Sequence, residues 1–80
     1  MRIDKFLKVS RIIKRRTIAN EACDTGRVTV NGKIVKASHD VNIGDIIEIK
    51  LGERILKVKV ESIAEHVLKG EASELYTVLS

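Results

Sequence analysis

Hydrophobic residues recur with two different spacings along the chain, and the change of spacing divides the chain into two parts. Near the N-terminus the spacing is helical, because Ile3, Phe6, Leu7 and Ser10 share one face at about 100° per residue. From Val28 onward hydrophobic and polar residues alternate, as they do along a strand that buries one face. The sequence therefore predicts an α+β fold, in which two packed N-terminal helices are followed by a small, mostly antiparallel sheet.

The two predicted helices cover residues of about 2–10 and 18–25. Thr17 precedes the second helix as its predicted N-cap, because a hydroxyl can accept a hydrogen bond from a free N–H of the first turn. Gly26 follows this helix, where a left-handed residue favours termination. The predicted apolar face of the second helix consists of Ile18, Ala19, Ala22 and Cys23. Its small alanines predict close packing against the first helix.

Two turn signals organise the alternating part of the chain. Asn31-Gly32 predicts a hairpin with a type I′ turn, because both residues tolerate a positive φ, and residues 33–36 form the predicted return strand. Gly52-Glu53 predicts another two-residue turn. The residues expected to point inward from the strands on either side of it are Ile47, Ile49, Leu51, Leu56, Val58 and Val60.

The C-terminal part is predicted to add a loop over residues 66–73 and a last strand over residues 74–80. A chain of this length suits one small domain. We expect a single domain over residues 1–80, with a core motif over about 1–51 and C-terminal strands over about 54–80.

Basic residues are concentrated in the N-terminal part. Residues 1–36 contain ten Lys and Arg against three acidic residues, whereas residues 37–80 contain five against eight, and the whole chain carries a net charge of +4. A cationic face suits a polyanionic partner. The chain has one Cys and no apolar stretch of the roughly 18 residues that a membrane span needs. These features predict a cytoplasmic protein without a membrane partner.

No arrangement of residues in the sequence indicates catalysis or metal binding. His39 and His66 have no neighbouring nucleophile with supporting residues, and Cys23 falls on a predicted buried face. The acidic residues do not have the spacing of a metal-binding loop. We therefore expect a binding protein that is not an enzyme and uses no cofactor.

The expected binding surface begins with the three cations of Lys14 to Arg16, which precede the second helix. Cations are unfavourable at a helix N-terminus unless an anion joins them, because the free N–H groups carry partial positive charge. Aromatic residues for base stacking are nearly absent, and the second helix exposes acidic residues, so backbone recognition of structured RNA fits better than DNA reading. The candidate RNA-binding residues are Arg2, Lys8, Arg11, Lys14, Arg15, Arg16, Arg27 and Lys33.

The segment KRRTIANEACDTGRVTVNGKIVKASHDVNIGD resembles the RNA-binding domain named after small-subunit ribosomal protein four, the S4 domain. The positions that match its pattern are Arg16, Thr17, Ala19, Gly26, Val28, Val30, Asn31, Gly32, Gly44 and Asp45. The N-terminal segment MRIDKFLKVSRIIKRRT resembles the short, stand-alone branch of RqcP-type ribosome-associated quality-control factors, and also the fifteen-kilodalton heat-shock protein. The resemblance implies RNA contacts foremost at Arg2 and Arg16.

The resemblance also implies a role on stalled ribosomes that have split. The implied partners are large-subunit rRNA, the peptidyl-tRNA on the 50S subunit and an RqcH-type protein, whose C-terminal alanine tailing such factors support. We expect a monomer in solution. Three alternatives stay open at this point: subunit rescue in the manner of the heat-shock protein, a detached RNA-binding module serving a pseudouridine synthase or rRNA methyltransferase, and a protein-interaction adaptor that uses the acidic C-terminal half.

Overall fold

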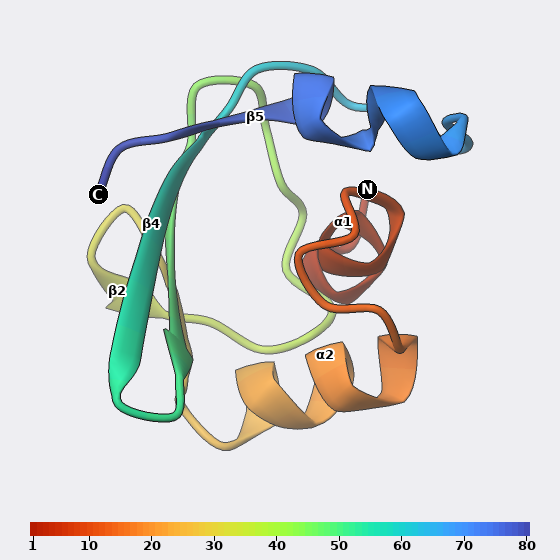
Figure 1. The fold of residues 1–80 in the computed structure, drawn as a ribbon. Helices are drawn as coiled ribbons and strands as arrows, with labels where there is room; N and C mark the ends of the chain where they lie inside the picture. Colours follow the sequence, from red (N-terminus) through yellow and green to blue (C-terminus); the bar gives the residue numbers. More distant parts are fainter.

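The computed structural model describes residues 1–80 apart from the side chain of Lys69. The elements in chain order are α1 (Ile3–Val9), α2 (Arg16–Asp24), β1 (Val28–Val30), β2 (Lys33–Ile34), β3 (Ile46–Leu51), β4 (Arg54–Val60), the 3₁₀ helix η1 (Lys69–Leu75) and β5 (Tyr76–Val78). Both α-helices lie on one side of the sheet, and the segment between β4 and β5 returns to that side, beside α1 (Figure 1). The predicted α+β fold is thus confirmed.

The strands form one sheet in the order β2-β1-β3-β4-β5, and every neighbouring pair is antiparallel. The long hairpin of β3 and β4 is its centre, with Ile47 paired to Val58. The short strands β2 and β5 are its edges. The C-terminal strands therefore extend the same sheet that the N-terminal hairpin begins.

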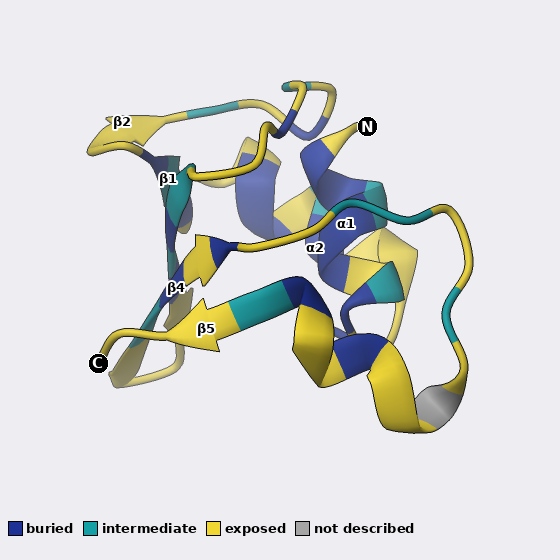
Figure 2. Ribbon diagram, turned by 90° about the horizontal axis from the view of Figure 1, so that it is seen from above, coloured by how far each residue is buried: buried dark blue, intermediate teal, exposed yellow. Residues whose placement is uncertain are grey.

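The core lies between the helices and the inner face of the sheet (Figure 2). Its fully buried side chains include Ile3, Phe6, Leu7, Val28, Ile47, Ile49, Val58 and Val60. Cys23 is also buried, as predicted, and burial together with the charges of Asp4 and Asp24 raises the pKa of its thiol to about 11. This thiol therefore stays protonated at neutral pH and serves as a small core residue.

The predicted turn at Asn31-Gly32 is confirmed. Both residues have positive φ, 51° and 85°, and the turn joins β1 to β2. The Asn31 side chain does more than tolerate this conformation, because its Oδ1 accepts the Ile46 N–H at 2.9 Å and its Nδ2 donates to Asp45 Oδ1 at 3.1 Å. These bonds attach the turn to the start of β3.

The prediction for the start of the second helix is wrong. The helix begins at Arg16, Arg15 occupies the N-cap position, and no side-chain capping bond forms there among the described residues. Thr17 therefore lies inside the first turn, and Ile18, expected in the core, is 47% exposed. The physical reason is the contact of Arg16 with a carboxylate of α1, described below, which compensates the cation at the helix N-terminus.

Three predictions for the strands and the C-terminal part also need correction. Part of the predicted loop over residues 66–73 is the 3₁₀ helix η1, which buries Ala72 and Leu75. Leu51, at the end of β3, is 41% exposed, and it pairs with Arg54 next to the turn that joins β3 to β4. The return strand of the first hairpin is shorter than predicted and ends at Ile34.

In the part of the chain that the structure describes, no helix combines the length and the apolar character needed to cross a bilayer.

Candidate nucleic-acid interface

The first candidate site is built around Asp4, whose side chain is only 2% exposed. Asp4 lies in the first turn of α1 and points toward the start of α2. Arg2 donates two hydrogen bonds to it, from Nε to Oδ1 and from Nη2 to Oδ2, both at 3.1 Å. This is the parallel fork geometry that an arginine forms with a carboxylate.

The second helix contributes further donors to the same carboxylate. Asn20 Nδ2 donates to Asp4 Oδ2 at 3.2 Å, and Arg16 Nη2 lies 3.5 Å from Asp4 Oδ1. The backbone N–H of Lys5 completes the set at 2.8 Å from Oδ1. Asp4 therefore joins α1 to α2 and draws the guanidinium groups of Arg2 and Arg16 to the same place.

The charge of Asp4 is retained although the carboxylate is buried. Burial acts to raise the pKa of Asp4, but the hydrogen bonds from Arg2 and Asn20 and the charge of Arg16 outweigh it, so the pKa is lowered below its ordinary value. At neutral pH the cluster therefore consists of one carboxylate and two guanidinium groups, which leaves one net positive charge.

This lowered pKa predicts how stability depends on pH. The stabilisation from Asp4 should be complete above its unfolded pKa of about 4 and be lost as pH falls through the lower folded value. We expect the difference in unfolding free energy between wild type and Asp4→Asn to be constant from neutral pH to about pH 5 and to shrink below about pH 4. Urea unfolding at a series of pH values measures this difference; a difference that persists unchanged at about pH 2 contradicts the assignment.

A cavity of about 400 Å³ lies over this cluster and is lined by Arg2, Asp4, Arg16, Thr17 and Asn20. The side chains of Arg2 and Arg16 are each 47% exposed, so part of each guanidinium faces solvent. Arginine has five N–H donors, and Arg2 uses two of them on Asp4. The remaining donors can bind a phosphate in a fixed orientation, because Asp4 already holds the groups in place. We name this cavity, defined by its five lining residues, the Asp4 cavity.

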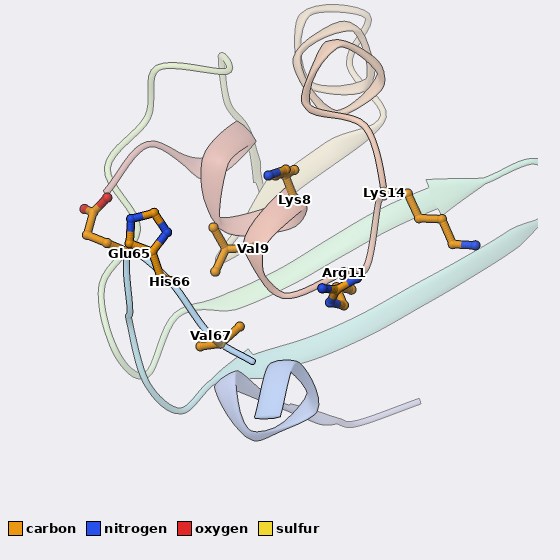
Figure 3. A pocket seen from close by; sticks show the side chains of 7 residues that line it. All are labelled: Lys8, Val9, Arg11, Lys14, Glu65, His66 and Val67. Carbon is orange, nitrogen blue, oxygen red and sulfur yellow. The ribbon is translucent and has the colours of Figure 1, made fainter. Parts of the chain in front are cut away.

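Three other predicted residues line a second cavity, of about 240 Å³ (Figure 3). Lys8 belongs to α1, and Arg11 and Lys14 belong to the segment that connects α1 to α2. The opposite wall comes from the C-terminal part of the chain, at residues 65–67. The structure thus brings five of the eight predicted residues to two cavities, which are lined by residues from the N-terminal part of the chain up to the start of α2.

The remaining three predicted residues lie elsewhere. Arg15 is exposed at the N-cap of α2. Arg27 follows the other end of that helix and donates from Nε to Thr25 Oγ1 at 3.0 Å, and Lys33 is exposed on the edge strand β2. A nine-residue helix spans about 13 Å, so Arg27 lies about this far or farther from the N-terminal cations. Contacts of Arg27 and Lys33 with RNA stay predictions.

Three residues of these sites are not among those predicted from the sequence, namely Asp4, Asn20 and His66. A signal existed for Asp4, since it lies beside Leu7 on the helical wheel, at the border of the apolar face, where a charge needs a partner. The pairing of Asp4 with Asn20 and the approach of His66 to α1 have no local signal, because they depend on how distant segments pack. Among the described residues, no three His, Cys, Asp or Glu side chains form a group that could hold a metal ion.

Comparison with known proteins places these sites in a family. Residues 1–47 match the S4 domain. The chain belongs to the S4 domain family. The Asp4 cavity, Lys8, Arg11 and Lys14 all lie within the matched residues of this S4 domain, whereas His66 lies outside them.

Relatives of this S4 domain protein match it over nearly its whole length. It is 53% identical over 78 residues to the RQC P-site tRNA stabilizing factor of Halalkalibacterium halodurans, covering 98% of the chain and 89% of that protein. It is 48% identical to the protein of the same name in Bacillus subtilis, with 99% and 92% covered. The structure of Vibrio cholerae heat shock protein 15, described as trimeric, has a TM-score of 0.92 at 31% identity and covers 100% of this chain and 82% of that one.

Proposed function

We propose that this protein is a non-enzymatic RNA-binding factor of ribosome-associated quality control, located in the cytoplasm on large ribosomal subunits. It binds large-subunit rRNA and the P-site tRNA on subunits left by stalled, split ribosomes. It supports C-terminal alanine tailing of the nascent chain by an RqcH-type partner and acts as a single-domain monomer.

The observation that carries the RNA-binding part is the pair of guanidinium groups in the Asp4 cavity. Arg2 at the N-cap of α1 and Arg16 at the start of α2 meet on one buried carboxylate, and each keeps part of its surface exposed. For stability alone such an arrangement is a weak choice, because a buried charge needs costly compensation. For recognition it is useful, because it presents two oriented donor groups to a phosphate.

The ribosomal part of the proposal is supported by the relatives. Two proteins that match almost the entire chain are named as factors that stabilise the P-site tRNA in this quality-control process. The cationic residues of α1 and of the segment before α2 fit that role, because both rRNA and tRNA present closely spaced phosphates. The proposed contacts are Arg2, Lys8, Arg11, Lys14, Arg15, Arg16, Arg27 and Lys33.

Binding to large subunits is expected to depend strongly on salt. Each phosphate neutralised by Lys or Arg releases counterions, with a slope of roughly −0.7 to −0.9 in log K against log salt per contact. One phosphate in each of the two cavities therefore predicts a slope of about −1.5 or steeper. Sedimentation of the protein with large subunits across a salt series gives the slope. A slope near zero contradicts an interface based on cations and phosphates.

The proposed function is tested by capture of the tagged protein from a bacterial lysate, followed by sequencing of bound RNA and identification of bound proteins. We expect 23S rRNA, tRNA and an RqcH-type protein to be recovered together. A matched Arg16→Ala capture should lose all three. Recovery of protein partners without RNA contradicts the proposal and supports the alternative of a protein-interaction adaptor.

A second candidate function is rescue of large subunits in the manner of heat shock protein 15. The observation in its favour is the structural likeness to the Vibrio cholerae protein. The same capture distinguishes the two, because rescue without alanine tailing predicts subunits that carry tRNA but no RqcH-type protein.

A further inference from the structure

We propose that residues 65–67 complete a second RNA-phosphate pocket with α1, in which His66 is a ligand of a backbone phosphodiester. This inference rests on the proposed function, because it takes RNA as the ligand. It goes beyond that function, because His66 lies outside the residues that match the S4 domain. The ligand chemistry is a phosphate anion bound by Lys8, Arg11, Lys14 and His66.

The first observation is the convergence of basic side chains from two distant parts of the chain on one cavity. Lys8, Arg11 and Lys14 come from α1 and the following segment, and His66 comes from the segment after β4. Figure 3 shows Lys8 and Arg11 between His66 on one side and Lys14 on the other. The cavity has a volume of about 240 Å³, which leaves room for a phosphate group.

The second observation is the charge balance of this cavity. In the described structure, the side chains of Lys8, Arg11 and Lys14 form no ion pair with a carboxylate. The one acidic lining residue, Glu65, pairs instead with Lys5. Three cations without a protein anion repel one another across the cavity, and an anion removes that repulsion.

The third observation is the backbone conformation of Arg11. Its φ of 63° is left-handed, which is unfavourable for a residue with a Cβ. The chain is held in this conformation by the bonds of the Arg11 N–H to the Lys8 carbonyl at 3.0 Å and of the Ile13 N–H to the Leu7 carbonyl at 3.1 Å. The turn follows the end of α1, and the side chains of Lys8 and Arg11, three residues apart, both line the cavity.

Glu65 has a positioning role. Its ion pair with Lys5 attaches the segment after β4 to α1. The hydrogen bond from Lys5 and the positive charge of Lys5 lower the pKa of Glu65, and His66 makes a smaller contribution in the same direction. Val67, from the same segment, and Val9, at the end of α1, are the apolar lining residues of the cavity. The neighbours of His66 in sequence therefore attach its segment to α1 and to the cavity that His66 lines.

A double-mutant cycle on large-subunit binding tests whether His66 and Arg11 hold the same phosphate. The variants are His66→Ala and Arg11→Asn, because asparagine tolerates a left-handed conformation, and the control is Lys59→Ala on the exposed side of β4. We expect His66→Ala to weaken binding roughly two- to tenfold, as for one lost hydrogen bond. The effects of His66→Ala and Arg11→Asn should be less than additive, whereas His66→Ala and Arg16→Ala should be additive. Thermal unfolding verifies that each variant is folded.

Two outcomes of the cycle overturn the second pocket. The second pocket is overturned if His66→Ala binds large subunits with wild-type affinity. It is also overturned if the losses of affinity in His66→Ala and Arg11→Asn are additive. If Arg16→Ala loses binding while His66→Ala does not, the proposed function stands and only the second pocket fails. If the wild-type protein does not bind large subunits at all, both proposals fail.

Nuclear magnetic resonance with two probes identifies the source of the phosphate. One probe is an RNA hairpin without terminal phosphates, and the other is inorganic phosphate. Shifts of the Arg11 and His66 resonances with the hairpin, lost in Glu65→Gln, support a backbone phosphodiester in a pocket that Glu65 positions. Shifts with inorganic phosphate but not with the hairpin overturn the assignment to RNA.

Discussion

Replacing Arg16 with alanine is expected to weaken binding to large ribosomal subunits by about 1–3 kcal/mol, or roughly 5- to 150-fold. The expectation follows from the structure, because Arg16 lines the Asp4 cavity and is 47% exposed there. Folding should survive, since the distance from Arg16 Nη2 to Asp4 Oδ1 is 3.5 Å and Asp4 keeps its shorter bonds to Arg2, Asn20 and the Lys5 N–H.

Two further variants separate charge from geometry in this result. Arg16→Lys keeps the charge but loses the planar fork of donors, so it should recover only part of the affinity. The double change of Lys57 and Lys59 to alanine removes two cations from β4 and should reduce the affinity much less. The charge of Lys57 is already partly compensated, because its Nζ lies 3.8 Å from Glu48 Oε1. An equal loss in the β4 variant would mean that RNA binds a different face.

Replacing Asp4 with asparagine is expected to lower the unfolding free energy by about 1.5–3 kcal/mol, the value of a hydrogen bond to a charged group. Asp4 is buried and accepts bonds from both helices, so the change removes the charge on which Arg2 and Arg16 meet. Urea unfolding at neutral pH measures the loss. Wild-type stability in this variant would contradict the role given to the carboxylate.

The same variant tests whether Asp4 orients the arginines for RNA. Asp4→Asn raises the net charge of the protein by one, so electrostatic attraction alone predicts tighter binding to large subunits. Positioning predicts weaker binding, because Arg2 and Arg16 would have to be immobilised on association at about 0.5–1.5 kcal/mol each. We expect weaker binding. Tighter binding at the same salt concentration would show that the fixed geometry is unimportant.

The sequence predicts those parts of the fold that depend on neighbouring residues. The hairpin at Asn31-Gly32 follows from two residues that accept a positive φ, and the structure has it in the predicted register. The burial of Val58 and Val60 follows from the alternation along β4. Such features are local, so the rules that relate residue type to conformation determine them.

The parts that could not be predicted depend on packing between distant segments. The local rule for capping favoured a start of α2 after Thr17, but the helix begins at Arg16, where Asp4 of the other helix compensates the charge. Arg16 looked unfavourable at the start of this helix because its carboxylate partner, Asp4, is twelve residues away in sequence. The role of His66 has no local signal for the same reason, since contacts between distant segments, among them the pairing of Lys5 with Glu65 and the packing of Val67 on the core, bring its segment to α1.

The central claim is that the protein recognises large subunits that carry a P-site tRNA, through the arginines of the Asp4 cavity. The most direct measurement compares its dissociation constant for purified large subunits with and without P-site peptidyl-tRNA, under the same salt conditions, for wild type and Arg16→Ala. We expect wild type to bind more tightly when the tRNA is present, and Arg16→Ala to bind both particles with clearly lower affinity. Equal affinity for the two particles, or an Arg16→Ala variant that binds like wild type, would contradict it.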